Sequence, residues 1–136
     1  MPRDRGGIME EIDKLIEFYR EHMPENVALI KNEKRHNEVE QAIKDIAQFV
    51  YETDEAARVS VQPDDLTGTS ITVEIIADVV VIDMVDKFCD ALRKADNFEV
   101  CAKTNGKICL GLVFEGVFKP APPKEEPFPE YFNEEK

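Results

Sequence analysis

The dipeptide Asn105-Gly106, set between two β-rich runs, is the local feature that most restricts what this chain can fold into. Gly adopts a positive φ without a steric clash, and Asn-Gly before a β run is typical of a tight hairpin. We therefore expect residues 98–103 and 107–118 to pair as antiparallel strands. A two-residue type I′ turn and a three-residue turn with a G1 bulge both fit the spacing.

The two turns place different side chains on each face of the hairpin. In the three-residue turn, Lys103 pairs with Lys107. One face then carries apolar side chains alone: Phe98, Val100, Ala102, Ile108, Leu110 and Leu112. The other face carries Glu99, Cys101, Cys109 and Gly111. A slip of one residue moves every side chain to the opposite face, so the apolar pattern favours the bulged hairpin, and we predict it.

A strand and an amphipathic helix are predicted before the hairpin. Ile71, Val73 and Ile75 alternate with polar neighbours, as in a half-buried strand. The helix is predicted from four apolar residues at helical spacing, which are Val81, Val85, Phe88 and Leu92. Asp83 is its expected N-cap. Residues 77–82 are rich in β-branched side chains, so a strand that continues as far as residue 82 is the open alternative.

The sequence before residue 53 predicts two helices. The first covers residues 8–23, where apolar side chains form one stripe, and Pro24 ends or restarts it. Residues 24–52 are predicted to be helical again, in one piece or two. Asn37 with Glu40 resembles a capping box, which favours a break near residues 32–37. One long helix with an exposed middle is the alternative.

These elements predict an α+β fold. Two N-terminal helices precede a four-stranded, mainly antiparallel sheet in β-β-α-β-β order, with the helices on one face. A strand over residues 57–62 supplies the first β element, and a turn over 63–68 follows it. The expected organisation is a flexible leader at 1–7, one domain at 8–118 and a Pro- and Glu-rich tail at 119–136, which is expected to be extended.

The net charge of −12 restricts the class of partner. Binding to phosphate depends on Lys and Arg, so neither nucleic acid nor an anionic membrane is expected as a direct partner. No apolar run approaches the ~20 residues that span a bilayer, and the N-terminal residues have no signal-peptide pattern. Three cysteines without a Cys-x-x-Cys motif indicate reduced thiols, so we expect a cytoplasmic protein.

Motifs for catalysis or cofactor binding are absent from the sequence. It contains no G-x-G-x-x-G, no P-loop and no G-x-S-x-G. Glu33 and His36 have the E-x-x-H spacing of di-iron bundles, but such sites need a second copy, and His22 does not supply one. We predict no catalytic residue, no cofactor and no metal site. An enzyme is less expected than a binding protein.

The residues predicted to bind a partner are acidic rows and tail aromatics. One row lies on the first helix and comprises Glu10, Asp13, Glu17 and Glu21. A second lies on the third helix and comprises Asp83, Asp86 and Asp90. The tail contributes Phe128, Tyr131 and Phe132, which can insert into a partner as a linear motif.

The open face of the predicted sheet is too apolar to be fully solvated. It would carry Thr72, Glu74, Ile76, Cys101, Cys109, Val113 and Val117. Either a homodimer or the tail is expected to cover it.

The function expected from these features is a small acidic protein-interaction module without catalysis. It would act as an adaptor or regulator and bind a basic or amphipathic protein. A chaperone-like role is included, because the acidity and the sheet-plus-helix order resemble secretion-chaperone-type domains at the level of fold. One alternative is an acidic mimic of nucleic acid that blocks a DNA-binding protein, of the sort phages use. A second is a small-ligand-binding protein or enzyme that uses the open sheet face.

Overall fold

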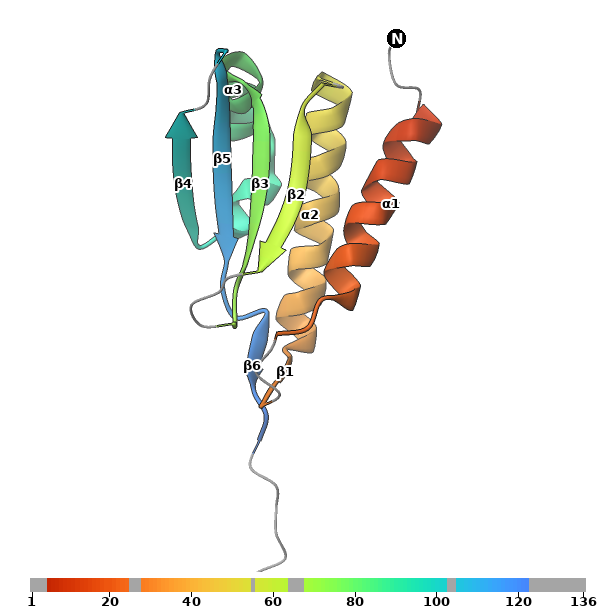
Figure 1. The fold of residues 1–136 in the computed structure, drawn as a ribbon, viewed down its shortest axis with the longest axis vertical. Helices are drawn as coiled ribbons and strands as arrows, with labels where there is room; N and C mark the ends of the chain where they lie inside the picture. Colours follow the sequence, from red (N-terminus) through yellow and green to blue (C-terminus); the bar gives the residue numbers. More distant parts are fainter. Residues whose placement is uncertain (1–4, 25–27, 55, 64–67, 103–104, 123–136) are drawn as a thin grey trace, which may run out of the picture.

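The computed structural model describes residues 5–24, 28–54, 56–63, 68–102 and 105–122. A four-stranded antiparallel sheet packs against a layer of helices (Figure 1). In chain order the elements are α1 (Arg5–Glu21), β1 (Leu29–Lys31), α2 (Glu33–Thr53), β2 (Arg58–Pro63), β3 (Ile71–Asp78), α3 (Val79–Phe88), the 3-10 helix η1 (Asp90–Lys94), β4 (Asn97–Ala102), β5 (Lys107–Phe114) and β6 (Phe118–Pro120). The predicted α+β fold and its β-β-α-β-β order are confirmed.

The strand order of the sheet is β2-β3-β5-β4, and every neighbouring pair is antiparallel. The predicted hairpin register is confirmed, with Phe98 opposite Leu112 and Val100 opposite Leu110. Asn105 and Gly106 both have positive φ, at 64° and 77°, a backbone conformation that Asn and Gly adopt more readily than other residues. β3 and β5 therefore form the centre of the sheet, and β2 and β4 form its two edges.

Two rows of side chains cross the sheet on the face that the helices cover. The Val59 row consists of Val59, Ile75, Leu110 and Val100. The Val61 row consists of Val61, Val73, Leu112 and Phe98. The β2, β3 and β5 members of both rows are buried, whereas the β4 members are exposed. Helix cover therefore ends before β4.

The helical layer places α2 between α1 and α3, since α2 packs against both (Figure 1). α1 contributes Ile8, Ile12, Ile16 and Tyr19 to the core. α2 contributes a longer buried stripe, which comprises His36, Val39, Ala42, Ile43, Ile46, Ala47, Val50 and Tyr51. None of the helices in the described part of the chain has a segment that is long and apolar enough to cross a bilayer.

The prediction for residues 24–52 was partly wrong. Residues 29–31 form strand β1 and not a helix, and α2 begins at Glu33 after Asn32, not at a capping box around Asn37. β1 pairs with β6, with Leu29 opposite Pro120 and Lys31 opposite Phe118. The partner strand lies some ninety residues further along the chain, so no local pattern could reveal this ribbon.

The last predicted strand is divided in two. β5 ends at Phe114, and Gly116 with φ 77° turns the chain into β6. Val117 is consequently buried in the core and does not lie on the open sheet face as predicted. On that face Thr72, Glu74, Ile76 and Val113 are half-buried and Cys109 is buried.

The third helix differs from its prediction at both ends. β3 ends at Asp78, and α3 begins at Val79 with Asp78 as its N-cap residue, so the predicted cap at Asp83 was wrong. The β-branched run after Asp78 is helical, because burial of Val81 and Val85 outweighs strand propensity. The helix stops at Phe88, which is exposed, and the separate 3-10 helix η1 begins at Asp90.

Candidate functional site

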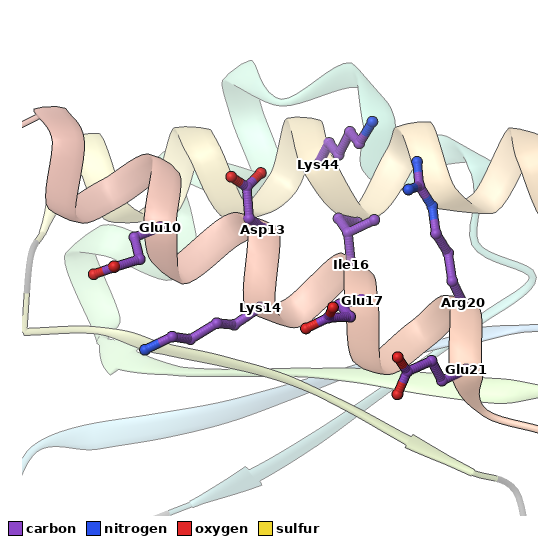
Figure 2. Close-up of a pocket in the computed structure, with 8 residues that line it drawn as sticks. All are labelled: Glu10, Asp13, Lys14, Ile16, Glu17, Arg20, Glu21 and Lys44. Atoms are coloured by element: carbon purple, nitrogen blue, oxygen red, sulfur yellow. The ribbon is translucent and has the colours of Figure 1, made fainter.

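The acidic row predicted on the first helix lies on one exposed flank of α1. Glu10, Asp13, Glu17 and Glu21 are all exposed, and all four line one surface hollow of about 500 Å³ (Figure 2). Their spacing of three to four residues places them on adjacent turns of the helix. The remaining residues of the hollow are Lys14, Ile16, Arg20 and, from α2, Lys44. The four carboxylates thus lie together on one flank of the helix, as their spacing indicates, and their role in binding a partner stays a prediction.

Ion pairs reduce the positive charge available inside this acidic hollow. The Arg20 guanidinium donates two hydrogen bonds of 2.8 Å to Glu40 on α2, and this contact lowers the pKa of the Glu40 carboxyl. Lys44 Nζ lies 3.7 Å from the same carboxylate. Within the part of the chain that the structure describes, no ion pair engages the four carboxylates of the α1 row. Their negative charge therefore remains directed at solvent.

An apolar groove runs along the other flank of α1, between this helix and edge strand β2. It has a volume of about 340 Å³, and its lining residues are Glu11, Lys14, Leu15, Phe18, Tyr51, Val59, Ser60 and Val61. Phe18 is 52% exposed, so the groove presents an apolar side chain that a partner could cover. Sequence reasoning missed this groove because β2 is distant in sequence. The signal for it was Phe18, an aromatic residue one position outside the buried stripe of α1.

The floor of the groove is fixed by a hydrogen bond between a helix and a strand. The backbone N–H of Val59 donates to Tyr51 Oη over 3.2 Å, and both residues are buried. In an antiparallel strand, alternate N–H groups point toward and away from the neighbouring strand. The Val59 N–H thus points away from β3, and Tyr51 satisfies it. The groove is lined by a sheet edge that is held in place.

The second acidic set lies on the other side of α2. Asp83 and Asp86 are exposed on α3, and Asp90 is exposed at the start of η1. Asp83 forms an ion pair of 3.1 Å with Lys87 one helical turn away. Because α2 separates α1 from α3, the structure does not join these aspartates to the α1 row (Figure 1). The tail aromatics Phe128, Tyr131 and Phe132 lie outside the described residues.

A buried aromatic cluster occupies the junction of α1, α2 and β6. The rings of Tyr19 and His36 stack with their centroids 4.3 Å apart, and Phe118 meets His36 edge-on at 6.1 Å. Tyr19 Oη donates to the His36 carbonyl oxygen at 2.9 Å. His36 is therefore a core residue, and its side chain is not presented at the surface beside Glu33. It extends the Val39-Ile43 stripe by one turn, and that spacing was the signal in the sequence.

Burial also sets the ionisation of this cluster. It lowers the pKa of His36 and raises the pKa of Tyr19 above its ordinary value. Among the described residues, His36 Nε2 has no hydrogen-bond partner. No group of three or more His, Cys, Asp or Glu side chains is arranged to hold a metal ion within those same residues.

Comparisons with models of protein families, with curated proteins and with solved structures gave no significant match to this chain. The surface of α1 is thus interpreted from its own geometry. It brings an acidic hollow and an apolar groove to the two flanks of one helix.

Proposed function

We propose that the protein is an interaction module that binds a basic, amphipathic protein segment across α1. The observation that carries this proposal is the position of α1 between the acidic hollow and the apolar groove. A segment with apolar side chains on one side and Lys or Arg on the other can contact both surfaces at once. Lys14 lines both, so the two surfaces adjoin at this residue.

The groove would supply most of the affinity. Burial of apolar surface contributes roughly 25 cal/mol per Å², and Phe18 and Leu15 offer such surface beside β2. The carboxylates of the α1 row would contribute less, because exposed ion pairs contribute about 0–1 kcal/mol each. Their field would instead accelerate encounter with a basic segment and select against acidic ones.

An extended segment fits the groove better than a helix does. By alternation along β2, the N–H of Val61 points to the same free edge as the N–H of Val59. A strand-like segment could accept a hydrogen bond from it while its side chains contact Phe18. This mode combines edge pairing with pockets for alternate side chains.

The test is a binding titration with a fluorescein-labelled ten-residue peptide of alternating Leu and Lys. Binding to the full chain is expected, and Phe18→Asp should weaken it at least tenfold. The double variant Glu17→Lys/Glu21→Lys should also weaken binding of the peptide, and the loss of affinity should be larger at low salt than at high salt. A peptide of alternating Leu and Glu is the charge control. Phe98→Asp is the matched control variant, since Phe98 is 50% exposed but lies at the opposite edge of the sheet.

Equal weakening by Phe18→Asp and Phe98→Asp would show that the peptide does not use the groove, and the proposed function would be lost. No binding by the wild-type chain to either peptide would have the same consequence.

We also propose that the protein is a homodimer in the cytoplasm. The described residues include nine large apolar side chains that are exposed, and self-association would cover part of them: Met9, Phe18, Met23, Ile30, Val79, Val80, Phe88, Phe98 and Val100. The cytoplasmic location rests on the cysteine content of the sequence.

A further inference from the structure

We infer that β4 is the surface through which two copies of this chain associate. The β4 strands would pair antiparallel about a two-fold axis at Val100 and join the two sheets into one. This inference rests on the proposed homodimer and assigns its interface. It involves the opposite edge of the sheet from the α1 groove, so both surfaces can be occupied together (Figure 1).

The side chains of β4 are exposed on a face of the sheet that is otherwise buried. Leu110 and Leu112 on β5 are 6% and 0% exposed, whereas their neighbours Val100 and Phe98 on β4 are 66% and 50% exposed. α3 packs on β3 and β5, and no described helix packs extensively on β4. The apolar rows of the core thus continue past the last helix and end in solvent.

The backbone of β4 also directs hydrogen-bonding groups to its free edge. The N–H of Phe98 donates to the Oδ1 of its neighbour Asn97 at 2.9 Å, so it does not point to β5. Alternation then directs the N–H and C=O of Val100 to the free edge. The Val59 row gives the same result. The Val59 N–H points away from β3 because it bonds to Tyr51, so Ile75 pairs through its backbone with Leu110 on β5, and the N–H of Val100 points away from β5. Such an edge accepts another strand.

The register about Val100 follows from this direction and from charge. Val100 of each copy would donate its N–H to the Val100 carbonyl of the other. A register centred on Glu99 would place two carboxylates directly opposite each other, and such like-charged cross-strand pairs are destabilising. Centring on Val100 avoids this contact and keeps both Phe98 side chains on the same face as the buried rows.

Charge and closure favour a second copy as the occupant. The carboxylates of the α1 row lie on the helix that packs against β2, the edge strand opposite β4. Pairing through β4 therefore keeps the acidic helices of two copies, each of net charge −12, as far apart as the sheet allows. A two-fold axis also closes the assembly, since each copy uses its single exposed β4 edge.

The apolar area exposed near this edge is comparable with that of a small interface. Phe98 is 50% exposed and Phe88, at the end of α3, is 66% exposed, so about half to two thirds of the roughly 150–250 Å² that an aromatic side chain can bury is still available at each. By helical periodicity Phe88 lies on the same face of α3 as Val81 and Val85, which face the sheet. With Val100 and the paired backbone, the two copies together approach the ~1,000 Å² of a specific interface.

Light scattering coupled to size-exclusion chromatography is the first test. The full wild-type chain should elute at twice the mass of one chain, Phe98→Asp at the mass of one chain, and the matched Phe18→Asp variant as the dimer. If Phe98→Asp stays dimeric, the assignment of β4 is overturned while the homodimer survives. A monomeric wild-type chain overturns both, and the peptide titration at the α1 groove remains an independent measurement.

Two further variants test the backbone pairing itself. Val100→Pro removes an N–H that points to solvent in the single chain, so it should leave folding intact by circular dichroism and abolish the dimer. Val100→Cys in a Cys101→Ser background should be crosslinked between copies by a short bismaleimide, whereas Phe18→Cys in the same background should not. A dimer that persists with Pro at position 100, or crosslinks equally at both positions, contradicts the two-fold axis at Val100.

Discussion

The two edge strands of the sheet, β2 and β4, end the same rows of side chains but have different surroundings. Val59 and Val100 stand at opposite ends of the Val59 row, yet their exposed fractions are 8% and 66%. On β2, the N–H of Val59 is satisfied by Tyr51, and Pro63 has no N–H to offer. On β4, the N–H of Phe98 donates to the exposed side chain of Asn97.

This difference shows two ways to deal with a sheet edge. Proteins usually protect an edge with a covering element, a proline or a charge, because an exposed edge accepts foreign strands. β2 has α1 beside it and a proline at its end. β4 combines an open edge with exposed Phe98 and Val100, so its surface is suited to a partner. The interface proposed for β4 follows from this contrast.

The largest expected effect comes from placing a charge at each end of the Val59 row. Val59→Asp buries a carboxylate without a cation and should lower the free energy of unfolding by about 3–5 kcal/mol. Val100→Asp should change the free energy of unfolding of the single chain by about 0.5 kcal/mol or less, and it should dissociate the dimer. Urea denaturation at low protein concentration measures both. Equal losses at the two positions would mean that β4 is covered in the single chain.

A change of pH should weaken the whole domain without favouring either edge. Burial lowers the pKa of His36 below its ordinary 6.5, so below about pH 6.5 the unfolded chain takes up a proton that the folded chain does not. Stability is thus full above this pH and falls as the pH decreases, by at most about 1.4 kcal/mol per pH unit. The groups that act on His36 are Lys31, Glu40, Glu33 and Arg20.

Urea denaturation between pH 7.5 and about 5 measures this effect, in a range where the lowered pKa values of Glu38 and Glu40 keep these carboxylates ionised. His36→Phe should flatten the profile, and His22→Gln serves as the control for the other histidine. A profile that is as steep in His36→Phe as in the wild type would assign the dependence to another group.

Loss of Arg35 should release the beginning of β4 from the helical layer. The Arg35 side chain is 17% exposed and bonds to Asp96 Oδ2 at 2.6 Å and to the Glu115 carbonyl at 2.9 Å. Arg35→Gln should cost about 1–2 kcal/mol, which is toward the lower part of the range for charged hydrogen bonds because Asp96 is partly solvated. Hydrogen exchange should accelerate at β4 amides and not at β2 amides. Uniform acceleration at both edges would contradict this role.

The smallest effect compares the side chains that satisfy an N–H at each edge. Tyr51→Phe leaves the buried Val59 N–H without its acceptor and should cost about 1 kcal/mol. Asn97→Ala removes an exposed acceptor from the Phe98 N–H and should change stability by about 0.5 kcal/mol or less. Thermal unfolding of both variants measures the difference. Two equal values would show that the edges are equally hydrated.

Local sequence was informative where neighbouring residues decide the structure. Asn105 and Gly106 predicted the turn, and alternation on both sides predicted the register of β4 and β5. The carboxylates of the α1 row could be placed on one helix flank from spacing alone. In each case the deciding interactions join residues that are close in the chain, so their pattern is written in the order of the amino acids.

Tertiary structure decided the features that join distant segments. β1 exists because β6 pairs with it, and the groove exists because β2 lies beside α1. Val59 and Val100 are both valines in strands with a similar alternation of side chains. Val59 is buried and Val100 is exposed because a neighbouring element covers β2 and none of the described helices covers β4. The sequence by itself determined which faces are apolar. What covers each face depends on how the layers pack, because burial is a property of the assembled chain and not of any one segment.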